Sequence, residues 1–146
     1  MKGSSVLIVV LLERGENIPR TKRGYDFNEV LSALQKEIRR GKEYDALFWA
    51  VELEGFNPTA LWNRLKIIAS EDVGIAHSSM PLLIDILEKQ YFKAVKDKDD
   101  SSRLFLANAI IALAKSPKSR MADDLVNVVY AEIQHENKKL PIPTTP

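Results

Sequence analysis

The chain has 146 residues and a mass of 16.5 kDa, contains no cysteine and carries a formal net charge of +1 at pH 7. This length suits one domain with its own hydrophobic core, and the lack of cysteine excludes disulfides and thiolate metal sites. The near-zero charge excludes a strong bulk attraction to nucleic acid. Bases outnumber acids in residues 14–42 and acids outnumber bases in residues 43–100, which indicates either pairing within an assembly or, more simply, solvated faces.

Residues 1–24 are expected to form an N-terminal extension and linker. Residues 6–12 are an apolar run rich in β-branched side chains, which suits a strand or a buried tail docked on the helices or on another subunit. The run is much shorter than the roughly 20 residues of a membrane span, and no signal-cleavage pattern follows it. We therefore expect a cytoplasmic protein without a membrane partner.

Two helices are predicted in the first third of the chain. Asp26, with Glu29 in a capping-box-like pair, begins a helix over residues 27–40, and Gly41 ends it. A second helix over residues 43–54 is apolar nearly all round, which predicts a central position. The apolar stripe of the first helix consists of Val30, Leu31, Leu34 and Ile38.

The stretch from Pro58 to Gly74 is predicted to be one amphipathic helix around which the others pack. Asn57 is a favourable N-cap, and proline is well tolerated at the first helical position. Glu71 and Asp72 lie near the C-terminus, where the helix dipole disfavours negative charge. We therefore expect these acids to accept hydrogen bonds from the next turn or to pair with a base such as Arg39 or Lys118. The buried stripe is predicted to be Leu61, Leu65, Ile68 and Ala69.

Three more helices are predicted over residues 81–96, 102–115 and 118–137, and the proline-rich tail 141–146 is expected to be extended. Ser79 is a candidate cap for the first of them, and Asp100 or Ser101 for the second. The fold predicted is an all-α bundle of about six helices with short loops. The side chains expected to be buried are Leu82, Leu83, Ile86, Leu87 and Phe92, then Leu104, Ala107, Ile110, Ile111 and Ala114, then Met121, Leu125, Val128, Val129 and Ile133.

Few residues carry a catalytic or metal-binding pattern. The sequence contains neither a Gly-x4-Gly-Lys-Ser/Thr phosphate-binding loop nor a Gly-x-Gly-x-x-Gly motif. His77 and His135 are isolated, and the acidic stretch 97–100 lacks the glycine and glutamate of a calcium loop. Glu71 and Asp72 are adjacent, so on a helix they point about 100° apart and suit acid/base catalysis poorly. No metal or cofactor is expected.

Two groups of residues could either contact nucleic acid or have an ordinary structural role. Trp49 and Trp62 could stack on bases, although core packing is the more common role of such side chains. Lys115, Lys118 and Arg120 bracket the Ser-Pro break, and Lys118 is expected at a helix start, where backbone N–H groups can bind phosphate. These three bases are the candidate DNA contact, and an ordinary charged surface is the alternative.

Four ordered motifs resemble the C-terminal region of the RarA/MgsA family, whose eukaryotic relative is the Werner-helicase-interacting protein. The segment 69–74, Ala-Ser-Glu-Asp-Val-Gly, matches the family's ASED-I/V-G signature, and the helix before it carries Arg64. The resemblance spans about residues 25–143. The other motifs are the helix from Tyr25-Asp26 to Ile38-Arg39, the stretch from Asp45 to Trp49, and the stretch Ser116 to Ser119. The signature residues, to which the resemblance gives structural roles, are Tyr25, Asp26, Arg39, Asp45, Trp49, Arg64, Ser70, Glu71, Asp72, Gly74, Pro117, Lys118 and Ser119.

The resemblance implies a clamp-loader-related AAA+ ATPase family that acts at replication forks, with its ATPase core preceding the part matched here. Residues 25–140 would then be the C-terminal oligomerisation domain, a tetramer by resemblance, that serves replication, recombination and repair without catalysis. One alternative is an adaptor that binds a separate AAA+ ATPase, a single-strand-binding protein or DNA. A hydrolase centred on Glu71 and Asp72 is a third and weaker hypothesis.

Overall fold

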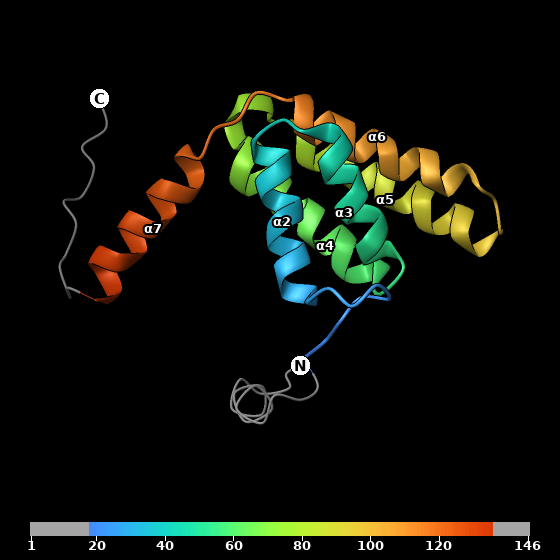
Figure 1. Cartoon of the computed structure of the whole chain (residues 1–146). Helices are drawn as coiled ribbons and strands as arrows, with labels where there is room; N and C mark the ends of the chain where they lie inside the picture. Colours follow the sequence, from blue (N-terminus) through green and yellow to red (C-terminus); the bar gives the residue numbers. More distant parts are fainter. Residues whose placement is uncertain (1–17, 136–146) are drawn as a thin grey trace.

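The computed structural model describes residues 18–135, which contain six α-helices and no strand (Figure 1). The predicted all-α class and helix number are therefore confirmed, while residues 6–12 and 141–146 lie outside the described part. Two short turns of other helical types, η1 (Ala69–Val73) and η2 (Gly74–His77), follow the third α-helix. The α-helices are α2 (Phe27–Arg39), α3 (Glu43–Glu54), α4 (Pro58–Ile68), α5 (Met80–Lys96), α6 (Ser101–Lys115) and α7 (Met121–Gln134).

The helices α2 and α4 begin where local chemistry predicts. The Asp26 carboxylate accepts hydrogen bonds from the backbone N–H groups of Asn28 (2.8 Å) and Glu29 (3.3 Å) at the start of α2. The Asn57 side chain accepts one from the N–H of Ala60 (3.0 Å) at the start of α4. These side chains satisfy backbone donors that the first helical turn leaves without partners.

The core lies between α2, α3, α4, α5 and α6. The predicted stripes of α2 and α4 are buried throughout, because each of these helices has one apolar and one polar face. Trp62 is fully buried, and its ring centroid lies 5.2 Å from that of Tyr91. The helices α2 and α3, like α5 and α6, are neighbours in sequence and pack side by side (Figure 1).

The inward faces predicted for α5 and α6 are partly wrong. Leu82, Leu83 and Ile86 of α5 are exposed, and so are Leu104 and Ile111 of α6. Both helices are apolar on more than one face, so periodicity alone does not decide which face is covered. Alanines decide it in part, since they allow close approach of neighbouring helices. The buried residues are Met80, Ile84, Leu87, Tyr91 and Ala94 in α5, and Leu106, Ala109, Ile110, Leu113 and Ala114 in α6.

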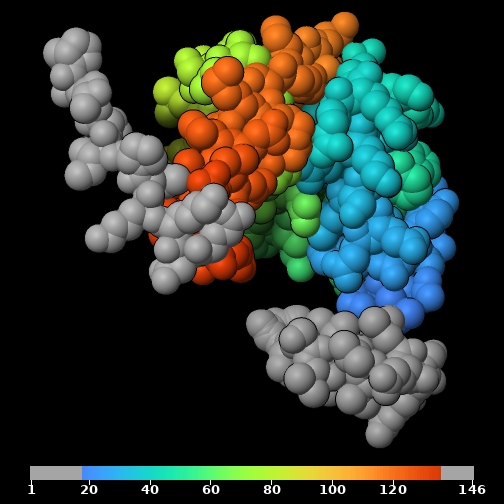
Figure 2. Space-filling view, turned by 90° about the vertical axis from the view of Figure 1, so that its left-hand side faces the viewer, coloured from blue at the N-terminus to red at the C-terminus, as the bar shows by residue number. Residues whose placement is uncertain are grey.

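The prediction for the last helix is wrong in a more informative way. α7 begins at Met121 rather than at Lys118, and none of its residues is buried. Ser116 adopts an extended conformation before Pro117, and α7 then runs away from the other helices (Figure 1). In Figure 2, which views the molecule from this side, α7 presents its side chains at the surface. The residues expected to be buried but found exposed are Met121, Leu125, Val128 and Ile133, while Val129 is half-buried.

Residues 18–24, expected to be the end of a linker, form a turn that packs on α3. Thr21 is only 4% exposed, and its hydroxyl donates a hydrogen bond to the Glu52 carboxylate (2.5 Å). Gly24 closes the turn with a φ of +90°. In the part of the chain that the structure describes, no helix is long and apolar enough to cross a bilayer.

Candidate functional site

The segment predicted as one helix from Pro58 to Gly74 changes geometry before its end. The α-helix stops at Ile68, and the next turn widens so that the Gly74 N–H bonds the carbonyl of Ala69, as in a π-helix. Gly74 has a φ of +53°, and a Cβ atom there would lie 2.9 Å from the Ser119 carbonyl oxygen. Glycine is therefore required both by the backbone conformation and by the close approach of the connection before α7.

The Asp72 carboxylate is fully buried beneath this connection. Its Oδ1 accepts hydrogen bonds from Arg39 Nε (3.0 Å) and from Arg120 Nη1 (2.6 Å), and its Oδ2 accepts one from the Gln35 amide (2.7 Å). The Asp72 backbone carbonyl accepts a further bond from the N–H of Ser119 (2.8 Å). One residue of η1 is thus bonded to α2 and to the connection 116–120, which satisfies a buried charge that would otherwise be costly.

Neighbouring polar residues extend this network. The Gln35 amide nitrogen also donates to the Glu71 carboxylate, and its oxygen accepts a hydrogen bond from Arg64 Nη1 (2.9 Å). The hydrogen bond to Asp72 raises the pKa of the Arg120 guanidinium. We call this set the Asp72 junction; it comprises Gln35, Arg39, Arg64, Glu71, Asp72, Ser119 and Arg120.

The Asp72 junction has the properties of a structural anchor rather than of a catalytic pair. Asp72 is shielded from solvent, and both of its carboxylate oxygens are bonded to the chain itself. A general base must reach a substrate proton, which this burial prevents. Across residues 18–135, no group of three His, Cys, Asp or Glu side chains is arranged to hold a metal ion.

The three bases singled out as a DNA contact do not form one open cluster. Lys118 precedes α7 rather than beginning it, and its Nζ donates to the carbonyls of Ala114 (2.9 Å) and Ser116 (2.5 Å). Burial lowers the pKa of Lys118. Arg120 bonds Asp72 and Asp123, so two of the three cations are occupied by the chain's own oxygens. Lys115 projects, with 68% of its side chain exposed and 3.9 Å from Glu43.

The remaining signature residues are spread over several elements. Tyr25 and Trp49 pack edge to face with ring centroids 5.1 Å apart, and Trp49 is half-buried against the core. Asp45 is exposed in the first turn of α3, where the helix dipole favours a negative charge. Ser70 is exposed on η1, and Pro117 lies in the extended connection.

Sequence reasoning missed Gln35 and the contact of Arg120 with Asp72. Gln35 is 6% exposed and lies between Leu34 and Ile38 on the buried stripe of α2. A polar residue at such a position signals a buried hydrogen bond, and this signal could have identified it. No local pattern links Arg120 to Asp72, because 48 residues separate them in the sequence. Two further contacts were also missed, the buried one of Thr21 with Glu52 and the partly buried one of the Tyr91 hydroxyl with Glu54 (2.6 Å).

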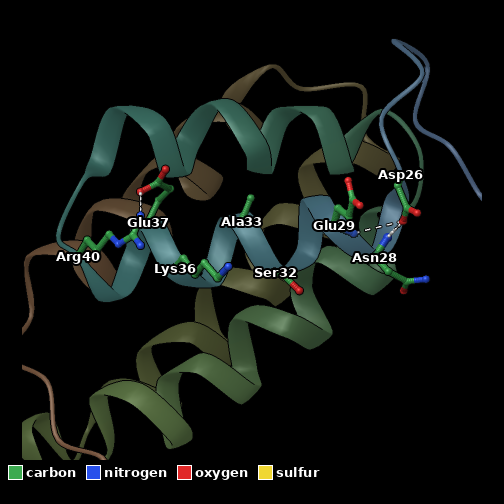
Figure 3. A pocket seen from close by; sticks show the side chains of 8 residues that line it. All are labelled: Asp26, Asn28, Glu29, Ser32, Ala33, Lys36, Glu37 and Arg40. Atoms are coloured by element: carbon green, nitrogen blue, oxygen red, sulfur yellow. Dashed lines mark hydrogen bonds and ion pairs between the residues drawn. The ribbon is translucent and has the colours of Figure 1, made fainter.

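A hollow of about 520 Å³ along the outer face of α2 offers no catalytic arrangement (Figure 3). Of its three acids, Asp26 and Glu29 lie at one end in the close-up and Glu37 lies towards the other, and Asp26 is used as the helix cap. The lining is polar and of mixed charge: Asp26, Asn28, Glu29, Ser32, Ala33, Lys36, Glu37 and Arg40.

Comparison with known proteins supports the resemblance found in the motifs. The family described as MgsA AAA+ ATPase C terminal matches residues 41–145. The chain is 33% identical over 115 residues to replication-associated recombination protein A of Bacillus subtilis (strain 168), an alignment that covers 77% of this chain and 26% of that protein. It is 30% identical over 122 residues to the protein of the same name from Haemophilus influenzae, covering 82% and 26%.

A eukaryotic relative is also similar to this chain over part of its own length. The chain is 25% identical over 145 residues to the ATPase WRNIP1 of Dictyostelium discoideum, covering 93% of this chain and 16% of that protein. The chain thus spans 16% to 26% of the length of these curated relatives. The matched region and the ordered motifs together show that the chain belongs to the C-terminal domain family of the MgsA-type AAA+ ATPases.

Proposed function

We propose that this chain is a non-catalytic oligomerisation domain that assembles as a tetramer and arranges RarA-type ATPase modules around a common axis. Its role would lie in replication-fork maintenance, recombination and repair; the name of its bacterial relatives refers to replication and recombination. The sequence contains no phosphate-binding loop, so ATP hydrolysis is assigned to a separate core and not to these 146 residues.

The observation that carries this proposal is the exposure of α7. Six of its apolar side chains are between 49% and 61% exposed, and within the described residues α7 packs mainly against η1 and η2. A helix of 14 residues is marginal in water unless an apolar face is covered. Exposed apolar surface of this kind marks protein interaction sites. The six side chains are Met121, Leu125, Val126, Val128, Tyr130 and Ile133.

The mass in solution tests the proposal directly. At tens of micromolar, size-exclusion chromatography with light scattering is expected to give four times the chain mass of 16.5 kDa. A Leu125→Asp/Val128→Asp variant should dissociate to the monomer while keeping the helical circular dichroism of the bundle. Leu82→Asp on α5 is the matched control, since Leu82 is 63% exposed but lies on a different helix. A monomeric wild-type chain contradicts the proposal.

A second proposal is that the same exposed surface binds a separate AAA+ ATPase in trans, which the lack of a phosphate-binding loop favours. A pull-down with a RarA-type ATPase that lacks its own C-terminal domain tests it. Binding is expected to disappear in the Leu125→Asp/Val128→Asp variant. Single-strand-binding protein and DNA are the other partners to assay, and loss of DNA binding in Lys115→Glu would assign DNA instead.

A further inference from the structure

An apolar groove runs along the outer face of α3, and the described residues leave it open. Two hollows of about 210 and 370 Å³ share Leu47 and Val51 in their lining, so they adjoin each other. Phe48 is 38% and Val51 is 52% exposed there. We call this surface the α3 groove; its apolar lining consists of Tyr44, Leu47, Phe48, Val51 and Leu106.

The charges in the lining of the α3 groove balance, with two acids, Glu52 and Glu54, and two bases, Arg23 and Arg103. Arg23 Nε lies 3.6 Å from the Glu52 carboxylate, and Glu54 accepts a hydrogen bond from the Tyr91 hydroxyl (2.6 Å). The groove therefore has no net charge with which to attract a charged helix. An uncharged apolar segment suits it better, because such a segment buries no charge of its own on binding.

The sequence contains such a segment. Residues 6–12, which lie outside the described part, are seven consecutive valine, leucine and isoleucine residues without a charge. Neither end of the chain outside residues 18–135 contains another apolar run of this length. Covering these side chains would remove apolar surface from water, which is the main favourable contribution to docking.

The connection of this segment to α3 favours it over a segment from a second copy. The Thr21 hydroxyl donates to Glu52 in the last turn of α3 (2.5 Å), and the Arg23 guanidinium lies 5.9 Å from the centre of the Phe48 ring. The turn 18–24, in blue in Figure 1, thus lies against the groove.

The linker is long enough to reach every part of the groove. Leu12 lies nine residues before Thr21, a stretch that spans up to about 30 Å, whereas the 12 residues of α3 are about 18 Å long. A short linker of this kind gives an effective concentration on the order of 1 mM. A free second copy at micromolar concentration competes poorly with a segment held so close.

We propose that residues 6–12 lie in the α3 groove of their own chain. Their apolar side chains cover Phe48 and Val51, while α7 stays available to other copies. The connection to α7 is bonded through Asp72 to Arg39 at the end of α2, whereas the turn 18–24 is paired with Asp26 before the start of α2. The contact is made within one chain, so it stands or falls independently of the oligomerisation proposed above.

Cross-linking within the full chain tests this contact, since the chain contains no cysteine and two engineered thiols form the only pair. In Val9→Cys/Val51→Cys, a short bismaleimide is expected to join the two thiols of one chain about fivefold faster than in Val9→Cys/Ile86→Cys. Ile86 is the matched control because it is 45% exposed, close to the 52% of Val51, but lies on α5. Equal rates overturn the inference.

The product of the reaction identifies the chain that supplies the segment. A link within one chain keeps the monomer mass on a denaturing gel, and peptide mass spectrometry locates it. Val9–Val51 links that run mainly between chains, seen as dimers on the gel, overturn the proposal in favour of a second copy. Faster linking in Val9→Cys/Val128→Cys overturns it in favour of α7. Light scattering tests oligomerisation separately in every case.

Thiol reactivity provides a second readout that does not depend on which of residues 6–12 meets Val51. The Val51→Cys thiol is expected to react with a maleimide fluorophore about fivefold faster once Leu7→Asp, Val9→Asp and Leu11→Asp are added, because carboxylates are disfavoured in an apolar groove. Ile86→Cys should react at the same rate in both backgrounds, and circular dichroism checks that the helices are intact. An unchanged rate at Val51→Cys overturns the proposal.

Discussion

At the scale of single residues, Asp72 links separate parts of the fold, because one buried carboxylate bonds side chains from α2 and from the connection to α7. Arg39 and Arg120 keep 44% and 38% of their side chains exposed, so water can partly hydrate them when the carboxylate is lost. Loss of the Asp72 charge should therefore lower the free energy of unfolding by less than loss of one partner of a fully buried ion pair.

Asp72→Asn is expected to lower the free energy of unfolding by about 2 kcal/mol, since a neutral amide cannot balance two guanidinium groups. Urea denaturation followed by circular dichroism measures this change. Asp85→Asn is the matched control: Asp85 pairs with Lys89 on the surface of α5, and its loss should change stability by less than about 0.5 kcal/mol. Equal effects in the two variants would contradict the anchoring role of Asp72.

The raised pKa of Tyr91 predicts that the protein loses stability at alkaline pH. Burial, followed by the hydrogen bond to Glu54, raises the pKa of Tyr91 above its ordinary value of 10.0. Because the folded-state pKa exceeds the unfolded one, this stabilisation is complete below pH 10.0 and is lost as the pH rises further. Denaturation at a series of pH values should therefore show a steeper decline above this point in the wild type than in Tyr91→Phe. Parallel curves would contradict it.

Residue roles could be predicted where the signal is local. Asp26 and Asn57 act as helix caps, as their positions before apolar periodic segments predict. Gln35 and Arg120 could not be assigned to Asp72 because their contacts depend on how distant segments fold together. The sequence thus indicated that the acids before Gly74 need partners and named Arg39 among them, without showing the complete network.

At the scale of elements, the turn η1 and Gly74 determine how the connection to α7 is seated. A straight α-helix to residue 74 was predicted from periodicity, and the positive φ of Gly74 shows why the helix ends earlier. Hydrophobic periodicity does not reveal a widened turn, since the same side chains remain on the buried side.

Gly74→Ala is expected to lower the free energy of unfolding by about 1–3 kcal/mol. Alanine is strained at a φ of +53°, and its Cβ would lie 2.9 Å from the Ser119 carbonyl oxygen. Thermal unfolding gives the total, and hydrogen exchange at the Ser119 N–H should show loss of protection. Gly24→Ala separates the two causes, because Gly24 has a φ of +90° but no atom within 4 Å of a new Cβ. If Gly74→Ala loses no more stability than Gly24→Ala, the proposed clash with the Ser119 carbonyl is excluded.

The faces of the helices could be predicted only where a single stripe exists. α2 and α4 each have one apolar face, and all of their predicted stripe residues are buried. α5 and α6 carry leucine and isoleucine on opposite sides, so their inward faces depended on neighbours that the sequence did not identify. For α7, periodicity predicted a buried face, and this prediction is wrong, because the other described helices do not cover it.

At the scale of the whole molecule, the all-α class, the number of helices and the family could be predicted from 146 residues. The arrangement of α7 could not, because a chain that completes its core with a second copy has the same amphipathic pattern as one that completes it alone. Within the described residues, α7 and α3 both leave apolar side chains exposed.

The Asp72 junction holds α7 at one end, so a small change of angle at the junction displaces the far end of α7. With 14 residues, α7 is about 21 Å long, so a tilt of about 10° at Arg120 moves its far end by about 4 Å. In the assembly proposed above, substitutions around Asp72 would alter the spacing and angle between neighbouring protomers without changing a side chain of α7 itself. Related chains could in this way diverge in the diameter of their assemblies while conserving the surfaces that meet.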